Sequence, residues 1–414
     1  MQKKSLFTPR KLFMWICIIF IAISMNFLNI PSESERFSIV TAIAIDIIDD
    51  EFYAGINTLS PTDTKQVKEK VFLAHGDNMT DAVENLSLLI GKELGFAHCN
   101  IIAIGDNLAR LGIPQHIDNL IRTKKVDRNS LIVTFNGEIK DFLESIAYLK
   151  KELSLDPQVL FKHNKQNIQS TATIIEEYYS DYYSENGVSI TSALTLTNEE
   201  GEGIEISSPS SGGGQDSSSG STGGDSSATE KKYLKNDGTT SIFKEGKKVL
   251  ELNQEQMRQV NLFRESTQKG TIQVDGVTDY FYNDATIIFE IKKQVTKLKP
   301  TIKNNEFKML IKSELDIRVI EIQEDERDFD ILKINDNYVT PTVKEMLIDK
   351  VDTEIQAIIE VARQHDIDFL GVYEKFNKKD YKKWHEFLDS LEDSSSFLDY
   401  VDFEIQPSIR TVSF

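Results

Sequence analysis

Cysteine and histidine are scarce in this sequence, and their scarcity excludes several kinds of protein. The chain has 414 residues, of which two are cysteines and six are histidines. Cys17 lies in an apolar run near the N-terminus and Cys99 lies in a separate apolar segment, so we expect no intrachain disulfide. An exported protein without disulfides fits a bacterium with one membrane better than a secreted eukaryotic protein, because small secreted domains depend on such bridges.

Metal-ligand and nucleophile motifs are also missing from the sequence. No two histidines have the spacing of metal ligands, so no metal site is predicted. A Gly-x-Ser-x-Gly elbow, which marks one class of serine hydrolase, does not occur. Asp46, Asp49, Asp50 and Glu51 form an acidic group, but they lack the spacing and the central glycine of a calcium-binding loop. We therefore interpret this group as a solvated turn.

Positive charge is in the minority. Lysine and arginine contribute 47 residues against 66 aspartates and glutamates, which gives a formal net charge of −19. A surface this acidic repels the phosphates of nucleic acids and of anionic lipids. No basic stripe with interleaved aromatic residues is present, so the sequence excludes nucleic-acid binding.

One long uncharged run lies near the N-terminus. Residues 12–30 read LFMWICIIFIAISMNFLNI, which is about the length of a membrane-spanning helix. The preceding tail, residues 1–11, contains the basic residues Lys3, Lys4, Arg10 and Lys11. Positive residues stay on the cytoplasmic side, so we predict a cytoplasmic tail, a membrane anchor and an extracytoplasmic remainder. A cleaved signal peptide and a lipoprotein remain open, although bulky residues occupy the expected cleavage region and Cys17 lies mid-run.

Residues 34–198 alternate between strand and helix patterns. Apolar, β-branched runs predict strands at residues 38–48, 52–60, 70–74, 97–105, 130–135 and 188–197. Helical periodicity predicts helices between them, the first starting at Thr80 and Asp81. We expect the first three strands to form an antiparallel meander and the whole segment to be a mixed α/β domain.

Residues 199–236 form the clearest boundary in the chain. Their central part, residues 207–229, consists largely of serine and glycine and has no large apolar residue. Such composition predicts a flexible linker. The glycines do not end in the Gly-Lys-Ser/Thr pattern of a phosphate-binding loop.

Two further units are predicted after the linker. Residues 237–278 form a small middle domain with a hairpin around residues 244–247, a helix at 253–264 and a strand at 271–274. A module of this size needs a neighbour for stability.

The C-terminal domain, residues 279–414, is predicted to be α+β. Long alternating strands at residues 285–298 and 307–323 precede an amphipathic helix at 341–363, whose apolar stripe we interpret as core. A shorter helix carries Trp384, which is interpreted either as a core residue or as an exposed interface residue. Carboxylate pairs of a hydrolase are not recognisable, since 66 acidic residues produce chance pairs.

Several stretches, taken in order, resemble the Ger(x)C family, the C subunit of bacterial spore germinant receptors. The similar stretches are residues 40–46 (VTAIAID), 97–105 (AHCNIIAIG) with Leu108 and Ala109, 119–122 (NLIR), 128–129 (RN), 241–244 (SIFK) with Leu250, Leu252 and Asn253, and finally Gln364, Asp368, 369–371 (FLG) and Trp384. The chain departs from the family pattern at residues 28–31, where the lipoprotein cysteine is missing, and at Asp127 and Tyr373. Its Ser/Gly linker is also unusually long.

The resemblance implies a fold, a partnership and a place of action. It implies three extracytoplasmic domains behind the anchor, no catalysis and no cofactor. It also implies a complex with two integral membrane subunits, of A-type and B-type, in the spore inner membrane. That complex senses a small-molecule germinant and triggers germination.

Six residues are our candidates for structural or interface roles: His98, Arg122, Gln364, Asp368, Gly371 and Trp384. Two other functions stay open. The chain could be a solute-binding protein that works alone, or a cell-envelope hydrolase that uses two carboxylates.

Overall fold

The computed structural model describes most of the chain after the predicted anchor. The described residues are 13–15, 18, 37–61, 67–124, 126–152, 167, 169, 171–197, 204–206, 232–235, 238–264, 269–324, 338–391 and 396–412. Apart from 13–15 and 18, the anchor at 12–30 lies outside these ranges, and most of the Ser/Gly linker does too. Among the described residues no helix combines the length and the apolar character needed to cross a membrane. The anchor therefore stays a prediction.

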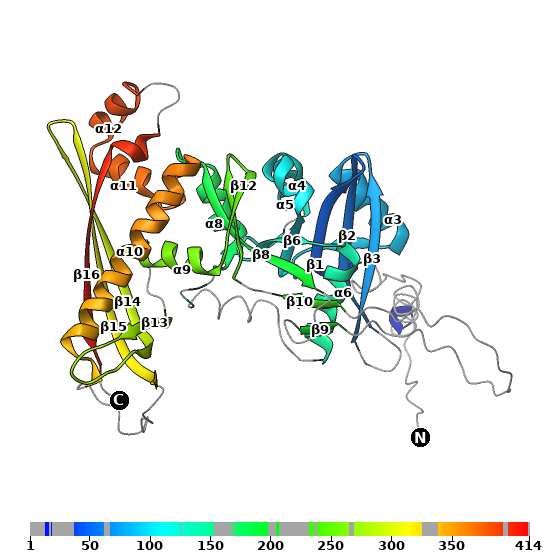
Figure 1. The fold of residues 1–414 in the computed structure, drawn as a ribbon. Helices are drawn as coiled ribbons and strands as arrows, with labels where there is room; N and C mark the ends of the chain where they lie inside the picture. Colours follow the sequence, from blue (N-terminus) through cyan, green and yellow to red (C-terminus); the bar gives the residue numbers. More distant parts are fainter. Residues whose placement is uncertain are drawn as a thin grey trace, which may run out of the picture.

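Two sheets lie side by side and give the molecule an elongated shape (Figure 1). The larger has twelve strands, and its main path runs in the order β12-β11-β8-β6-β5-β1-β2-β3. Its strands are β1 (Phe37–Ile48), β2 (Glu51–Pro61), β3 (Val67–Gly76), β4 (Glu93–Gly95), β5 (Ile101–Gly105), β6 (Leu131–Asn136), β7 (Thr173–Ile174), β8 (Val188–Thr197), β9 (Ile204–Ile206), β10 (Lys232–Lys235), β11 (Thr240–Lys244) and β12 (Lys247–Leu252). The mixed α+β class predicted from the sequence is confirmed.

Strand direction changes across the large sheet. β1, β2 and β3 form the predicted antiparallel meander, and Asp49 and Asp50, both at positive φ, make the tight turn between β1 and β2. β5 then pairs in parallel with β1, β6 with β5, and β8 with β6, which fits the helices that connect these strands. β11 and β12 close the sheet as an antiparallel hairpin.

The strand predicted at residues 97–105 is shorter than expected. It begins only at Ile101, because the N–H of Cys99 bonds to the Phe96 carbonyl in a turn. In this turn Cys99 is buried and His98 is exposed. The two side chains therefore point in different directions because of the turn, since neither residue belongs to a strand.

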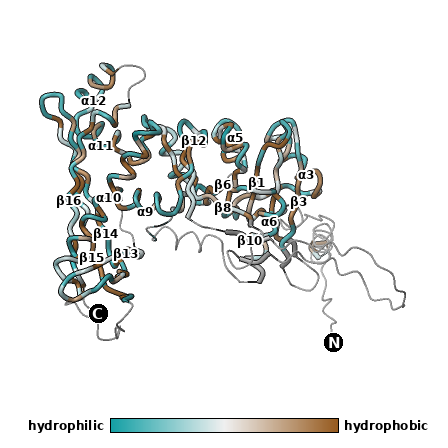
Figure 2. The backbone as a smooth tube through the Cα atoms, viewed as in Figure 1, coloured by the Kyte–Doolittle hydropathy of each residue, from teal (hydrophilic) through white to brown (hydrophobic). Residues whose placement is uncertain are grey.

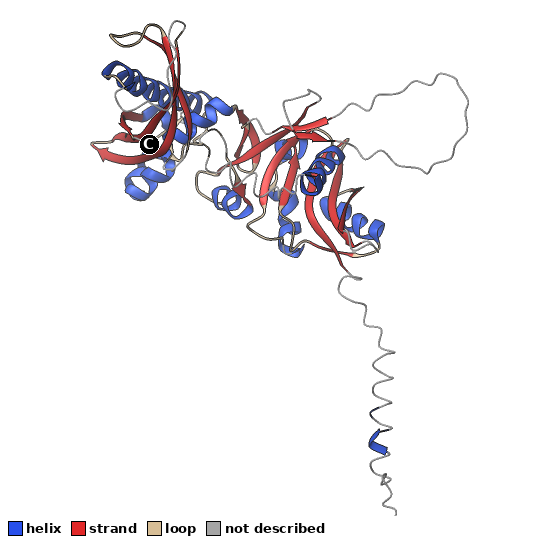
Figure 3. Ribbon diagram, turned by 90° about the horizontal axis from the view of Figure 1, so that it is seen from below, coloured by secondary structure: helices blue, strands red, loops and turns tan. Residues whose placement is uncertain are grey.

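Helices cover both faces of the large sheet (Figure 3). They are α3 (Met79–Ile90), α4 (Asp106–Leu111), α5 (Pro114–Lys124), α6 (Ile139–Glu152) and α8 (Ile175–Tyr182). Side chains alternate along a strand, so β1 sends Ile43 and Ile45 into the core under α3, α4, α5 and α8, and sends Ala42 and Ala44 into the core under α6. Figure 2 shows hydrophobic residues recurring along β1 and β6.

The smaller sheet has four strands in the order β13-β14-β15-β16. These are β13 (Gly270–Val277), β14 (Ala285–Lys303), β15 (Glu306–Gln323) and β16 (Val401–Thr411). β14 and β15 form one long hairpin that turns at Asn304 and Asn305, both with positive φ. β16 adds to β15 in parallel.

The helices of this second part are α9 (Gln254–Phe263), α10 (Pro341–His365), α11 (Val372–Lys379), α12 (Tyr381–Leu388) and the 3-10 helix η3 (Phe397–Tyr400). The amphipathic helix predicted at residues 341–363 is confirmed as α10. Thr340 caps it by accepting from the N–H of Val343, and its apolar stripe is buried in the core over the small sheet. Its exposed face is polar.

The residues of the predicted middle domain are shared between the two sheets. The predicted hairpin exists as β11 and β12, but it extends the large sheet, whereas β13 belongs to the small one. The buried cluster of the small sheet includes Ile242 and Leu252 of this hairpin together with residues of α9. The division into three domains therefore stays a prediction, and the packing described here is continuous across its boundaries.

Candidate functional site

The two sheet units meet where the loop after α8 contacts the turn after α10. Residues 183–187 connect α8 to β8, and residues 366–371 connect α10 to α11. Asn186 is buried in this contact, and its Nδ2 donates to the backbone oxygen of Asp368 at 2.8 Å. Lys244 of β11 donates from Nζ to the backbone oxygen of Asn186 at 3.1 Å. We call this contact the joint.

Asp368 organises the C-terminal side of the joint. Its buried carboxylate accepts from the backbone N–H groups of Gly371, Val372 and Tyr373 at 2.9, 3.0 and 2.7 Å, and so caps the N-terminus of α11. Gly371 has φ +80°, a conformation that favours glycine. Burial raises the pKa of Asp368, and the three N–H donors counteract part of that effect.

A second set of contacts surrounds Glu185. Its Oε2 accepts from the Tyr373 hydroxyl at 3.1 Å and from Asn377 Nδ2 at 2.8 Å, and lies 3.5 Å from His385 Nε2. Burial and the neighbouring Glu185 raise the pKa of Tyr373 to about 12. One loop of the large-sheet unit is thereby bound to both α11 and α12.

A small cavity of about 230 Å³ lies beside these contacts. It is lined mainly by polar side chains, among them Ser180, Asp181, Asn186, Arg264, Asp368 and Lys378. Arg264 donates from Nη2 to the Phe369 oxygen at 2.6 Å, and burial lowers its pKa. Burial raises the pKa of Asp181. The hydrogen bonds of Asn186 and Glu185 to the small-sheet unit fix the relative position of the two units here.

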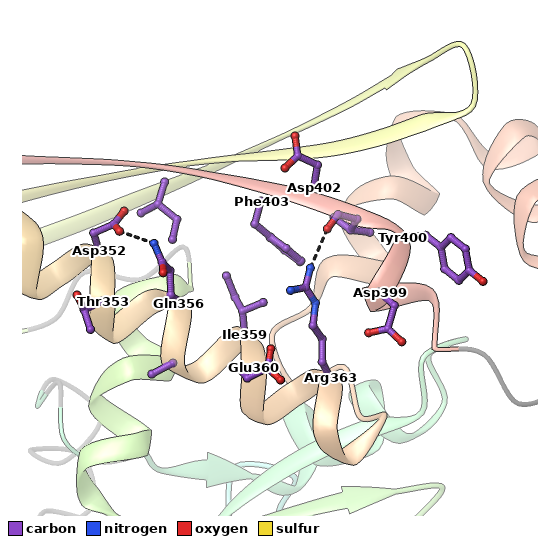
Figure 4. A pocket seen from close by; sticks show the side chains of 13 residues that line it. Asp352, Thr353, Gln356, Ile359, Glu360, Arg363, Asp399, Tyr400, Asp402 and Phe403 are labelled. Carbon is purple, nitrogen blue, oxygen red and sulfur yellow. Dashed lines mark hydrogen bonds between the residues drawn. The ribbon is translucent and has the colours of Figure 1, made fainter.

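A larger hollow lies elsewhere, between α10 and β16 (Figure 4). It is a groove of about 840 Å³ whose walls carry both carboxylates and apolar side chains. In the part of the chain that the structure covers, no group of three or more His, Cys, Asp or Glu residues could hold a metal ion.

The structure brings together two of the six candidate residues, Asp368 and Gly371, at the joint. Gln364 is exposed on the last turn of α10 and donates to Glu360 at 3.3 Å. Trp384 is fully buried and stacks on Phe376 with ring centroids 5.0 Å apart, as the core interpretation predicts.

The other two candidates lie in the large-sheet unit, away from the joint. His98 is exposed in the turn before β5. Arg122 is exposed on α5 and pairs with Asp118 one helical turn earlier. A partner contact by either residue stays a prediction.

Sequence reasoning missed Glu185, Asn186 and Arg264. The only local signal was Asn186-Gly187, a dipeptide typical of turns. Nothing in the sequence indicates which surface that turn contacts.

Comparison with known proteins adds family matches on both sides of the linker. Residues 31–196 match the family model described as spore germination protein N-terminal domain. Residues 238–411 match the model described as spore germination B3/GerAC like, C-terminal. The crystal structure of the GerBC protein is similar over 90% of this chain and 97% of its own, with a TM-score of 0.52 and 18% identity, which shows a shared fold. The curated proteins gave no match.

Proposed function

The chain belongs to the spore germination GerAC family, and from this premise we propose that it is a non-catalytic, membrane-anchored subunit of a nutrient germinant receptor. The observation that carries the proposal is the pair of family matches, which follow one another in order and cover residues 31–196 and 238–411. The similarity to the GerBC fold supports it.

The proposed complex contains two integral membrane subunits, of A-type and B-type. The chain is held in the spore inner membrane by residues 12–30, and the rest lies on the extracytoplasmic side. A small-molecule germinant binds to the complex. This chain acts by contacting one state of its partners better than the other, which is sufficient to shift their equilibrium.

The joint supports this mode of action. Asn186 and Glu185 link the two units through hydrogen bonds to the Asp368 main chain and to α11, so a displacement of one unit is passed to the other. The cavity beside the joint is small and is lined mainly by polar side chains, which fits a mechanical connection.

Deletion of the gene tests the proposal. In spores with no other intact gene of this family, we expect deletion to reduce the rate of nutrient-triggered germination at least about tenfold, an effect of the size that allosteric coupling supplies. The wild-type gene should restore the rate, and spore yield should not change. An unchanged nutrient response in that background would overturn the proposal. Ligand binding or peptidoglycan cleavage by the purified chain alone would then favour a solute-binding protein or a hydrolase.

A further inference from the structure

The last strand of the small sheet has an outer edge without a partner strand. β16 pairs with β15 on one side and ends the strand order of this sheet, and no strand of the described residues pairs with its other side. The N–H of Val412 donates to the Ile317 oxygen at 2.9 Å, so the main-chain groups of even-numbered residues face β15. The Val401 oxygen instead accepts from Arg363 of α10 at 3.0 Å. Odd-numbered residues therefore direct their main-chain groups away from β15.

Alternation along the strand extends this pattern to Phe403 and Ile405. Their N–H and C=O groups point to the outer edge, as those of Val401 do. Pro407 occupies the next outward position. Proline lacks an N–H and is confined to such edges, so its presence agrees with the assignment of this side as the open one.

The groove of about 840 Å³ runs between this edge and α10 (Figure 4). Its apolar lining comes from Ala357 and Ile359 on α10 and from Phe403 and Ile405 on β16. From residue 401 to residue 405 the strand spans about 13 Å at roughly 3.3 Å per residue. The groove thus has the length to hold about five residues of an extended chain, which would alternate side chains toward and away from α10.

Carboxylates line both walls of the groove. Asp352 and Glu360 come from α10, and Asp399 comes from η3. Asp402 of β16 also borders the groove, but its carboxylate points away from α10 and lies 3.6 Å from Lys308 on the other face of the sheet (Figure 4). Figure 4 shows Asp352 and Asp399 near opposite ends. Burial raises the pKa of Asp352, and the neighbouring Asp349 raises it further, so a cation at this wall would relieve an existing repulsion.

Arg363, the cation in the groove lining, already donates hydrogen bonds to main-chain oxygens of this chain. Arg363 donates from Nε to the Leu398 oxygen at 3.2 Å and from Nη2 to the Val401 oxygen at 3.0 Å. Its guanidinium carbon lies 5.3 Å from the centroid of the Phe403 ring. These contacts fix Arg363 at one end of the groove and leave three carboxylates, those of Asp352, Glu360 and Asp399, along it.

We propose that this groove binds an extended segment of a partner protein that carries lysine or arginine at alternate positions and adds to β16 as a fifth strand. Main-chain hydrogen bonds to Phe403 and Ile405 supply affinity, and the carboxylates select the charge of the segment. The proposal goes beyond the proposed function, because it does not depend on which complex the chain joins.

Peptide binding to the full-length chain in detergent micelles tests this proposal. The probe is a fluorescent peptide in which lysine alternates with valine, and its affinity is measured by anisotropy. One control peptide has glutamate for lysine, and the other has N-methylated alternate amides. We expect the lysine peptide to bind at least about tenfold more tightly than either control, and its binding to weaken as salt is raised.

Two pairs of variants locate the binding site. Asp352→Asn with Glu360→Gln should weaken binding at least about tenfold, whereas neutralising two distant exposed carboxylates, Glu84→Gln with Glu138→Gln, should not. Ile405→Pro removes one outward N–H and leaves the bonds to β15 in place. Ile405→Ala removes side-chain packing but keeps that N–H. We expect Ile405→Pro to weaken binding at least about fivefold more than Ile405→Ala, with both variants folded by circular dichroism.

Several results would overturn the proposal. They are no binding of the lysine peptide, equal binding of the glutamate peptide, and equal affinities of Ile405→Pro and Ile405→Ala. Self-association of the chain that the groove variants abolish would also overturn it, because the occupant would then be a second copy.

Discussion

The side-chain amide of Asn186 lies 2.8 Å from the backbone oxygen of Asp368, across 182 residues of sequence. Asp368 in turn caps α11 through its carboxylate. The same residue therefore accepts a hydrogen bond from the large-sheet unit and caps a helix of the small-sheet unit. This relationship makes the joint a specific connection.

Removing the Asn186 amide should weaken the joint. Asn186→Ala leaves the buried Asp368 oxygen without this donor, which should lower the free energy of unfolding by about 1–3 kcal/mol. Urea unfolding of the full chain, followed by tryptophan fluorescence in a Trp15→Phe background so that Trp384 is the reporter, measures the loss. Asn107→Ala is the matched control, because it removes an exposed amide that donates to Ile47 within one unit at 2.9 Å. Equal losses in the two variants would contradict the special role of the joint.

Replacing only one partner of the ion pair between α9 and α10 should lower the free energy of unfolding strongly. Arg258 binds Glu354 through two hydrogen bonds, of 3.1 and 2.8 Å, and the side chains are only 16% and 7% exposed. Arg258→Met should lower the free energy of unfolding by about 3 kcal/mol, because the buried Glu354 carboxylate then loses both hydrogen bonds and keeps only Lys350, 3.8 Å away.

Two comparison variants define this effect. Arg258→Met combined with Glu354→Met should cost less than Arg258→Met alone, since no charge is left buried. Arg410→Met breaks the pair with Asp316, in which Arg410 is 75% exposed, and should cost under about 1 kcal/mol. A double variant less stable than Arg258→Met would refute this account of the pair.

Gly105 should not accept a side chain. A Cβ at this position would lie 2.0 Å from Cγ of Asp46, whose Oδ1 accepts from the N–H of Leu108 at 2.9 Å. Gly105→Ala should therefore lower the free energy of unfolding by about 3 kcal/mol, through overpacking and loss of that cap. In Gly91→Ala the new Cβ meets nothing within 4 Å, and only the left-handed φ of +68° should cost about 1 kcal/mol. Chemical denaturation of both variants checks the difference, and equal costs would contradict the clash.

Asp368 should make stability depend on pH in a defined direction. Its pKa is raised by burial in the folded state, so the folded state binds more protons than the unfolded state as the group titrates. Its contribution to stability is therefore full below the ordinary carboxyl pKa of about 4 and is lost as pH rises through the raised pKa. The stability difference between wild type and Asp368→Asn should fall with rising pH.

Asp279 provides the opposite case. Burial tends to raise its pKa, but donors from Thr340, Phe281 and Tyr282 outweigh burial and lower it. The difference between wild type and Asp279→Asn should therefore rise with pH, and is lost as pH falls through the lowered pKa. Denaturation midpoints measured from pH 3 to about pH 8 test both directions, and parallel curves for the two variants would contradict the assignment.

Local features of the fold were predictable from the sequence. The apolar stripe of α10 lies within one segment, and it predicted the helix to within a few residues. The Thr340 cap and the proline at the first position, seen in the structure, are equally local features. The β1–β2–β3 meander was predictable because adjacent strands joined by short turns pair with one another.

Long-range pairing was not predictable from the same patterns. β8 lies between β6 and β11, and β16 pairs in parallel with β15, although periodicity shows only that each is a strand. The cap that Asp46 gives Leu108 joins residues 62 positions apart, so Asp46 was assigned to a turn. The joint was missed for the same reason, because the partner of Asn186 is set by packing and not by nearby sequence.

Affinity purification of the tagged full-length chain from spore inner membranes, followed by mass spectrometry, tests the receptor-subunit proposal most directly. The account predicts that two polytopic membrane proteins, the A-type and B-type subunits, are recovered with it in a constant ratio. Recovery of this chain alone, from spores that contain both of those proteins, would contradict the account.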